Sequence, residues 1–92
     1  MKRLAITEVG EPTLYRCINQ LKELHDKGYI NAPQYSEQAV YDEQGHLFAW
    51  RVQCCVRGYG MTCAVAPDKK SAKRECSYGM LCEVVELCND VE

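Results

Sequence analysis

Strict alternation of side-chain character between Phe48 and Arg57 is the feature that most constrains how this chain folds. Apolar residues occupy every second position, and mostly polar residues lie between them; the apolar set is Phe48, Trp50, Val52, Cys54 and Val56. Because successive side chains of a β-strand point to opposite faces of a sheet, this pattern predicts a strand with one apolar face. We expect Phe48 and Trp50 to pack in the core.

Two shorter segments predict strands on either side of this one. Before it, apolar residues between Tyr35 and Tyr41 are followed by the turn-forming residues 42–45. After it, a Gly-Tyr-Gly turn at 58–60 leads into Met61, Cys63 and Val65, which again alternate. Connections this short join neighbouring antiparallel strands, so the pattern predicts a three-stranded antiparallel sheet.

Helical spacing appears at both ends of the chain. Near the N-terminus, apolar residues recur at intervals of three and four, with Thr13 as the expected N-cap and Gly28 as the expected stop. Near the C-terminus, Asp68 is the expected N-cap of a second helix with an apolar face. The predicted helices are Thr13–Lys27 and Asp68–Cys88.

The resulting order is helix, three strands, helix. We predict an α+β fold of the α-β-β-β-α type, in which both helices cover one face of the sheet and the other face meets solvent. The 92 residues suffice for one such domain, with its core at about 13–88.

Composition and the absence of long apolar runs bear on the class of protein. With 47% apolar and 26% charged residues, the chain resembles ordinary globular proteins. Residues 1–10 are too short and polar for a signal peptide, and no apolar run approaches the roughly 20 residues that span a bilayer. We therefore expect a cytoplasmic protein with no membrane partner.

Seven cysteines raise the question of disulfides or a metal. They are Cys17, Cys54, Cys55, Cys63, Cys76, Cys82 and Cys88. An odd count without a secretory signal argues against a disulfide framework, and the spacings lack the paired pattern of zinc sites. We expect small apolar side chains, with no disulfide, no bound metal and no cofactor.

Charge is segregated along the chain although the net charge is −2. Residues 51–74 carry six basic residues and only one acidic residue, whereas the last 18 residues carry five acidic residues and no basic one. The segment Lys69-Lys70-Ser71-Ala72-Lys73-Arg74 places four cations at the start of the predicted second helix. The helix dipole disfavours cations there, so the arrangement points to an anion site; a solvated charged face is the alternative.

The stretch from Lys69 to Lys73 resembles the Lys-Lys-x-Ala-Lys signature that opens the last helix of double-stranded RNA-binding domains. Further positions match without gaps. Trp50 falls on the family's aromatic residue in the second strand, His46 on its loop histidine and Glu23 on a glutamate of its first helix, and Pro33 and Tyr35 match its Pro-x-Tyr entry to the first strand. The resemblance extends over about Leu14 to Leu87.

The resemblance implies how the chain would bind duplex RNA. The first helix, through Glu23, and the loop with His46 would enter two successive minor grooves, while Lys69, Lys70 and Lys73 would bind phosphates across the intervening major groove. Arg74 and Asp26 are secondary candidates. Asp26 stands where the family has a glutamine, and the family's Gly-Pro-x-His loop is shortened here to Gly45-His46.

The sequence contains no motif for catalysis, so we expect a protein that is not an enzyme. Two functions stay open. The first is binding of double-stranded RNA by shape with little sequence specificity, which the lysine cluster favours. The alternative is a domain of the same fold that docks another protein or a second copy of itself, with weak or no RNA binding; the shortened loop, Asp26 and the acidic C-terminus favour it.

Overall fold

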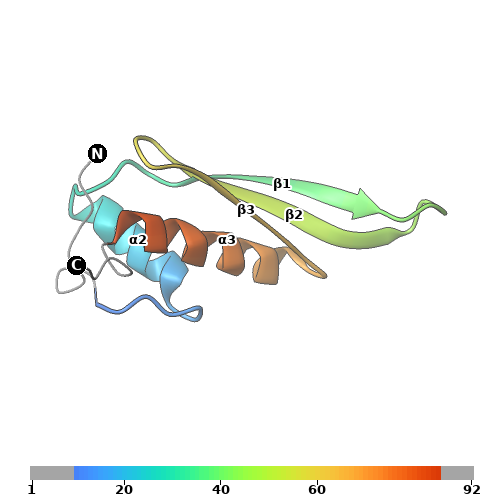
Figure 1. The fold of residues 1–92 in the computed structure, drawn as a ribbon, viewed down its shortest axis with the longest axis horizontal. Helices are drawn as coiled ribbons and strands as arrows, with labels where there is room; N and C mark the ends of the chain where they lie inside the picture. Colours follow the sequence, from blue (N-terminus) through green and yellow to red (C-terminus); the bar gives the residue numbers. More distant parts are fainter. Residues whose placement is uncertain (1–9, 86–92) are drawn as a thin grey trace, which may run out of the picture.

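The structure is a computed structural model, and it describes residues 10–85. Its elements follow the order helix, three strands, helix, so the predicted α-β-β-β-α fold is confirmed (Figure 1). Their bounds are α2 Cys17–Asp26, β1 Gln34–Tyr41, β2 Leu47–Val56, β3 Gly60–Ala66 and α3 Lys69–Val84.

The three strands form one antiparallel sheet in the order β1-β2-β3, which leaves β1 and β3 at its edges. Ala39 of β1 lies opposite Trp50, and Trp50 lies opposite Ala66 of β3. Since side chains alternate along a strand, Glu37 and Tyr35, which lie two and four positions before Ala39 on β1, share the Trp50 face. Both helices lie on one side of the sheet (Figure 1).

The core lies between that sheet face and the helices. Helix α3 packs against β2 and β3, and α2 packs against α3. Leu21 and Leu24 of α2, Val52 of β2, and Met80 and Leu81 of α3 are almost completely shielded from solvent. Burial of such side chains contributes about 1.5–3 kcal/mol each to the stability of the fold.

Helix α2 begins later than the sequence predicts. Residues 14–16 form turns, and the helix starts at Cys17, so the predicted N-cap Thr13 is wrong. The hydroxyl of Thr13 does accept a hydrogen bond from the backbone N–H of Arg16, at 3.1 Å, but this closes a local turn. The buried Gln20 holds the preceding segment in place, because its Nε2 donates to the Glu11 carbonyl at 3.1 Å.

The end of α2 agrees with the expected glycine stop. Gly28 has a φ of +83°, which a residue with a side chain rarely adopts. Its N–H donates to the His25 carbonyl, and the Tyr29 N–H donates to the Leu24 carbonyl. This pair of bonds defines a Schellman motif, which satisfies carbonyl groups that the helix end would leave unpaired.

Helix α3 starts as predicted and ends earlier. Its N-cap is Asp68, whose carboxylate accepts a hydrogen bond from the Ser71 N–H at 3.1 Å. The predicted end at Cys88 is wrong, since the helix stops at Val84 and Val85 has extended backbone. Cys88 and Leu87 themselves lie outside the described residues.

Phe48 is not in the core, which corrects the prediction from the alternating pattern. Its side chain is 68% exposed, whereas Val52, Cys54 and Val56 on the same strand are fully buried. The register explains the difference. Val40 lies opposite Ala49, but the next residue, Tyr41, lies opposite Leu47, so Phe48 is an extra residue in a β-bulge. The bulge interrupts the regular alternation of faces at Phe48, whose side chain is exposed.

The cysteines in the described part of the chain are free thiols. Cys17, Cys54 and Cys76 are buried in the core, and Cys55 and Cys63 are exposed on the outer sheet face. Within residues 10–85, no group of three or more His, Cys, Asp or Glu side chains is arranged to hold a metal ion. The expectation of no disulfide and no metal in the whole chain stays a prediction. None of the helices of the described part is long and apolar enough to cross a membrane.

Candidate nucleic-acid interface

The first turn of α3 presents basic side chains at the positive end of the helix dipole. Asp68, immediately before the helix, uses its carboxylate to cap the helix, and the hydrogen bonds from Ser71 lower the pKa of that carboxyl. No acidic residue occupies the first turn itself. Lys69 and Lys70 stand there instead, and both are exposed.

Lys69 lies between an aromatic ring and a carboxylate. Its ammonium nitrogen is 4.7 Å from the centre of the Trp50 ring and 3.6 Å from Oε1 of Glu37. The cation–π contact and the ion pair both hold the ammonium over the β1–β2 part of the sheet. Half of the Lys69 side chain remains accessible to solvent.

Lys73, one turn further along α3, rests on a second ring. Its ammonium nitrogen lies 4.5 Å from the centre of the Tyr35 ring. The Tyr35 hydroxyl in turn makes a 2.8 Å hydrogen bond with the hydroxyl of Ser77 on α3. Burial raises the pKa of Tyr35, so the phenol stays neutral over the physiological range. The Tyr35 ring is therefore held by two contacts with α3, one between its face and Lys73 and one between its hydroxyl and Ser77.

The other basic residues of this helix start differ in their surroundings. Lys70 is exposed and makes no ion pair or ring contact with any residue between 10 and 85. The Arg74 guanidinium lies 5.8 Å from the centre of the Tyr15 ring, which is itself 86% exposed. The Arg74 carbonyl accepts a hydrogen bond from the Cys17 thiol at 3.1 Å, which joins α3 to α2.

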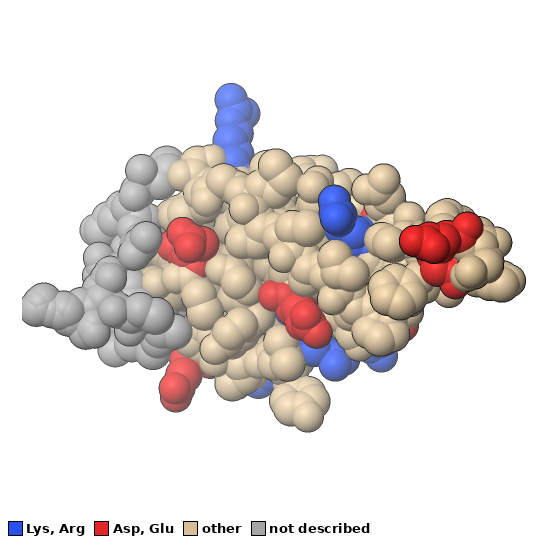
Figure 2. All heavy atoms as spheres, turned by 45° about the vertical axis from the view of Figure 1, so that its right-hand side comes forward, with Lys and Arg blue, Asp and Glu red and all other residues tan. Residues whose placement is uncertain are grey.

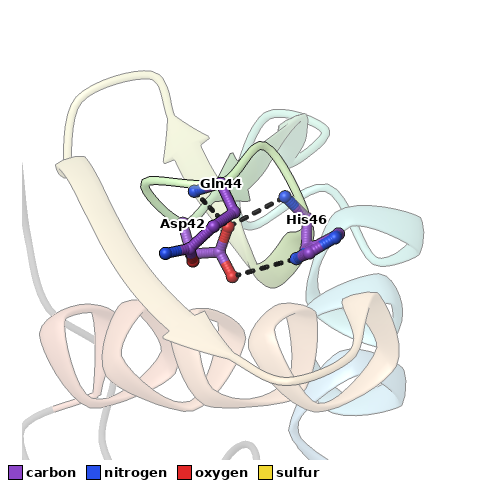
Figure 3. A network of polar contacts seen from close by, with 3 residues as sticks. All are labelled: Asp42, Gln44 and His46. Carbon is purple, nitrogen blue, oxygen red and sulfur yellow. Dashed lines mark hydrogen bonds and ion pairs between the residues drawn. The ribbon is translucent and has the colours of Figure 1, made fainter.

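The loop with His46 is a compact turn built around Asp42 (Figure 3). The Asp42 carboxylate accepts hydrogen bonds from the backbone N–H groups of Gln44, at 2.9 Å, and of His46, at 2.8 Å. Its second oxygen lies 3.7 Å from Nδ1 of His46. Gly45 completes the turn with a φ of +84°. The short loop is thus ordered by its own hydrogen bonds, and the His46 ring stands exposed at the tip of the hairpin.

The two candidates on α2, Glu23 and Asp26, are both exposed. They lie three positions apart and therefore on the same side of the helix. His25 is also exposed, and its Nδ1 is 3.2 Å from the Ile30 carbonyl.

The structure brings part of the predicted set together. Lys69 and Lys73 lie side by side on α3 over aromatic rings of the sheet, whereas Glu23 and Asp26 belong to the other helix. His46 is at the end of a hairpin that projects beyond the start of α3 (Figure 1). On the face drawn in Figure 2, acidic side chains gather at this projecting end, and basic side chains form small separate groups.

Sequence reasoning missed the residues on which the lysines rest. Trp50 was predicted as core packing, and it is half-buried with its ring under Lys69. Tyr35 and Glu37 were given no role at this site. Period-2 alternation places both on the Trp50 face of the sheet, but only the strand register and the position of α3 reveal which lysine each one meets.

No protein-family model matches the chain, and no solved structure matches it. Among curated proteins, it is similar to Ribonuclease 3 of Roseburia hominis, with 32% identity over 80 residues. The matched segment is 86% of this chain and 22% of that protein, so the chain spans about a fifth of the length of its relative.

Proposed function

We propose that this chain binds double-stranded RNA by shape, with little sequence specificity and without cleaving it. Lys69, Lys70 and Lys73 bind phosphates across the major groove, and Glu23 and His46 contact the flanking minor grooves. Arg74 and Asp26 lie beside these groups and contribute less. A-form RNA suits this mode, because its shallow minor groove exposes 2′-hydroxyls while its phosphates line the deep groove.

The observation that carries the proposal is the set of lysines at the start of α3. A cation in the first turn of a helix interacts unfavourably with the helix dipole, which lowers the stability of the helix by about 0.3–1 kcal/mol. Stability alone therefore does not account for these lysines. Two of the three are held in defined positions by aromatic rings. A neutral ring fixes an ammonium without cancelling its charge, so the ring contacts themselves leave the lysines able to bind an anion.

The similarity to Ribonuclease 3 supports an RNA ligand. That protein is named for an activity on RNA, and the matched segment includes most of this chain. The segment is a fifth of the relative, so we propose that RNA binding, and not the nuclease activity, belongs to it.

The test is a gel-shift titration with a 20-base-pair RNA duplex and the DNA duplex of the same sequence. We expect binding to the RNA duplex in preference to DNA, and full recovery of the RNA after incubation with Mg²⁺. Affinity should fall with salt, with a logarithmic slope of about 0.9 per neutralised phosphate, by analogy with duplex DNA. Changing Lys69, Lys70 and Lys73 together to alanine should flatten that slope by about two to three units. A triple variant that binds RNA like the parent would refute the proposal.

One observation favours a second function, the docking of another copy of this chain. The outer sheet face carries exposed apolar side chains at Met61, 59% exposed, and Val65, 48% exposed. Both belong to the edge strand β3, whose outward backbone groups pair with no other strand within residues 10–85 and could pair with a strand of a second copy. Analytical ultracentrifugation separates the two functions, because Met61→Lys and Val65→Lys should dissociate a dimer of this kind and leave RNA affinity unchanged.

A further inference from the structure

Glu37 is the one carboxylate that forms an ion pair with a lysine of the interface among the residues that the structure describes. Its Oε1 lies 3.6 Å from the Lys69 nitrogen, and its side chain is 44% exposed. Within residues 10–85, Lys73 contacts a ring but no carboxylate, and Lys70 contacts neither a ring nor a carboxylate. The lysines therefore differ in how much of their positive charge is already countered.

The position of Glu37 is unusual for a charged residue. It lies on the helix-facing side of β1, between Tyr35 and Ala39, and opposite the fully buried Val52. Such a position is usually occupied by an apolar side chain, because it borders the core. An exposed ion pair contributes little to the stability of a fold, so the pair with Lys69 does not by itself explain an acidic residue there.

We infer that Glu37 is an internal competitor of RNA phosphate for Lys69, an inference that rests on the proposed RNA binding. An ammonium group at this distance from a carboxylate has part of its charge neutralised before any ligand arrives. A phosphate that approaches Lys69 also approaches Glu37, and the two anions repel each other. Binding therefore requires Lys69 to leave Glu37, or the phosphate to accept a weaker contact. In both cases Glu37 lowers the affinity for the duplex.

Competition of this kind is specific to one lysine. The Trp50 ring contacts Lys69 independently of the carboxylate, so we expect that removing Glu37 leaves the ammonium supported by the ring and its charge uncompensated. Lys73 has no carboxylate partner in the described part of the chain, so its contribution to binding should respond only weakly to the loss of Glu37.

The test compares Glu37→Gln with Glu75→Gln in the duplex-RNA titration described above. The two substitutions change the net charge equally, but Glu75 lies exposed on α3 and forms no ion pair within the described residues. Glu37→Gln should bind the duplex about two- to fivefold more tightly than the parent, the factor that corresponds to loss of an exposed ion pair. Its salt slope should steepen by up to about 0.9, the value for one additional phosphate contact. Glu75→Gln should change neither quantity to that extent.

The same comparison in a Lys69→Ala background tests whether the effect of Glu37 on RNA affinity acts through Lys69. There the Glu37→Gln substitution should lose its effect, because no ammonium remains for the carboxylate to occupy. If Glu37→Gln binds RNA no more tightly than the parent, the inference fails and the proposed RNA binding stands. The same holds if Glu37→Gln increases the affinity equally with and without Lys69. A parent chain that binds no duplex RNA overturns the proposed function and the inference with it.

Discussion

The ammonium nitrogen of Lys73 lies 4.5 Å from the centre of the Tyr35 ring. This contact joins the first strand to the last helix, and it places a candidate phosphate-binding group on the surface of the core. Lys73 therefore belongs both to the fold and to the proposed site. Stability and binding should respond together when it is changed, which distinguishes it from the exposed Lys70.

Lys70→Ala and Lys73→Ala should separate these two roles. Both variants should lose RNA affinity and about 0.9 of the salt slope. Only Lys73→Ala should also lower the free energy of unfolding relative to Lys70→Ala, by about 0.5–1 kcal/mol, because it alone removes a cation–π contact. Urea denaturation measures the stability difference. Equal stabilities of the two variants would mean that the Tyr35 contact has no energetic weight.

Tyr35→Phe and Tyr35→Leu should distinguish the ring from the hydroxyl. The phenylalanine variant keeps the ring and loses the 2.8 Å hydrogen bond to Ser77, which is fully buried. We expect it to be less stable by about 1–3 kcal/mol, the range for a buried polar group left without a partner, with RNA affinity retained. The leucine variant should lose affinity as well. Unfolding curves and gel shifts on the same preparations provide the comparison.

The fold was largely predictable because local patterns and tertiary structure agree. Period-2 alternation around Val52 and helical spacing around Leu21 each match the face that is buried. The two exceptions have identifiable structural causes. Thr13 forms a turn in place of a cap, and the bulge at Phe48 depends on how β1 and β2 pair, which no pattern within β2 alone records.

The candidate site was predictable in its basic residues but not in their environment. The lysines of α3 were found because four cations stand together against the helix dipole. The roles of Trp50 and Glu37 depend on contacts between segments far apart in the sequence. The register of the sheet places these residues on one face, but the approach of α3 to that face decides that they meet Lys69.

Phe48→Ser should leave the stability of the fold within about 0.5 kcal/mol of the parent, as expected of an exposed residue. Leu21→Ala, at a fully buried position, should cost about 2–5 kcal/mol through lost burial and the cavity it leaves. Thermal or urea unfolding of both variants measures the contrast. A cost for Phe48→Ser comparable to that of Leu21→Ala would contradict the exposed position of Phe48.

The buried thiols should make the protein less stable at alkaline pH. Burial raises the pKa of the Cys54 thiol to about 11 and that of the Cys76 thiol to about 12, from the ordinary value of 9.0. Since these thiols ionise more readily in the unfolded chain, their contribution to stability is complete below pH 9 and is lost as the pH rises towards 11–12. Urea denaturation under reducing conditions at pH 8 and pH 10.5 should show the decrease. Cys54→Ala should flatten it, whereas the exposed Cys55→Ala should decline as steeply as the parent.

The hairpin that carries His46 extends beyond α3, and its tip is closed by hydrogen bonds to Asp42, a residue of the tip itself. Neither the helices nor the core determine how long this tip must be. Residues could be added or exchanged between Asp42 and His46 without repacking the rest of the protein. The reach of the loop towards a ligand is therefore free to evolve separately from folding, so that one stable scaffold can support descendants with different binding strengths.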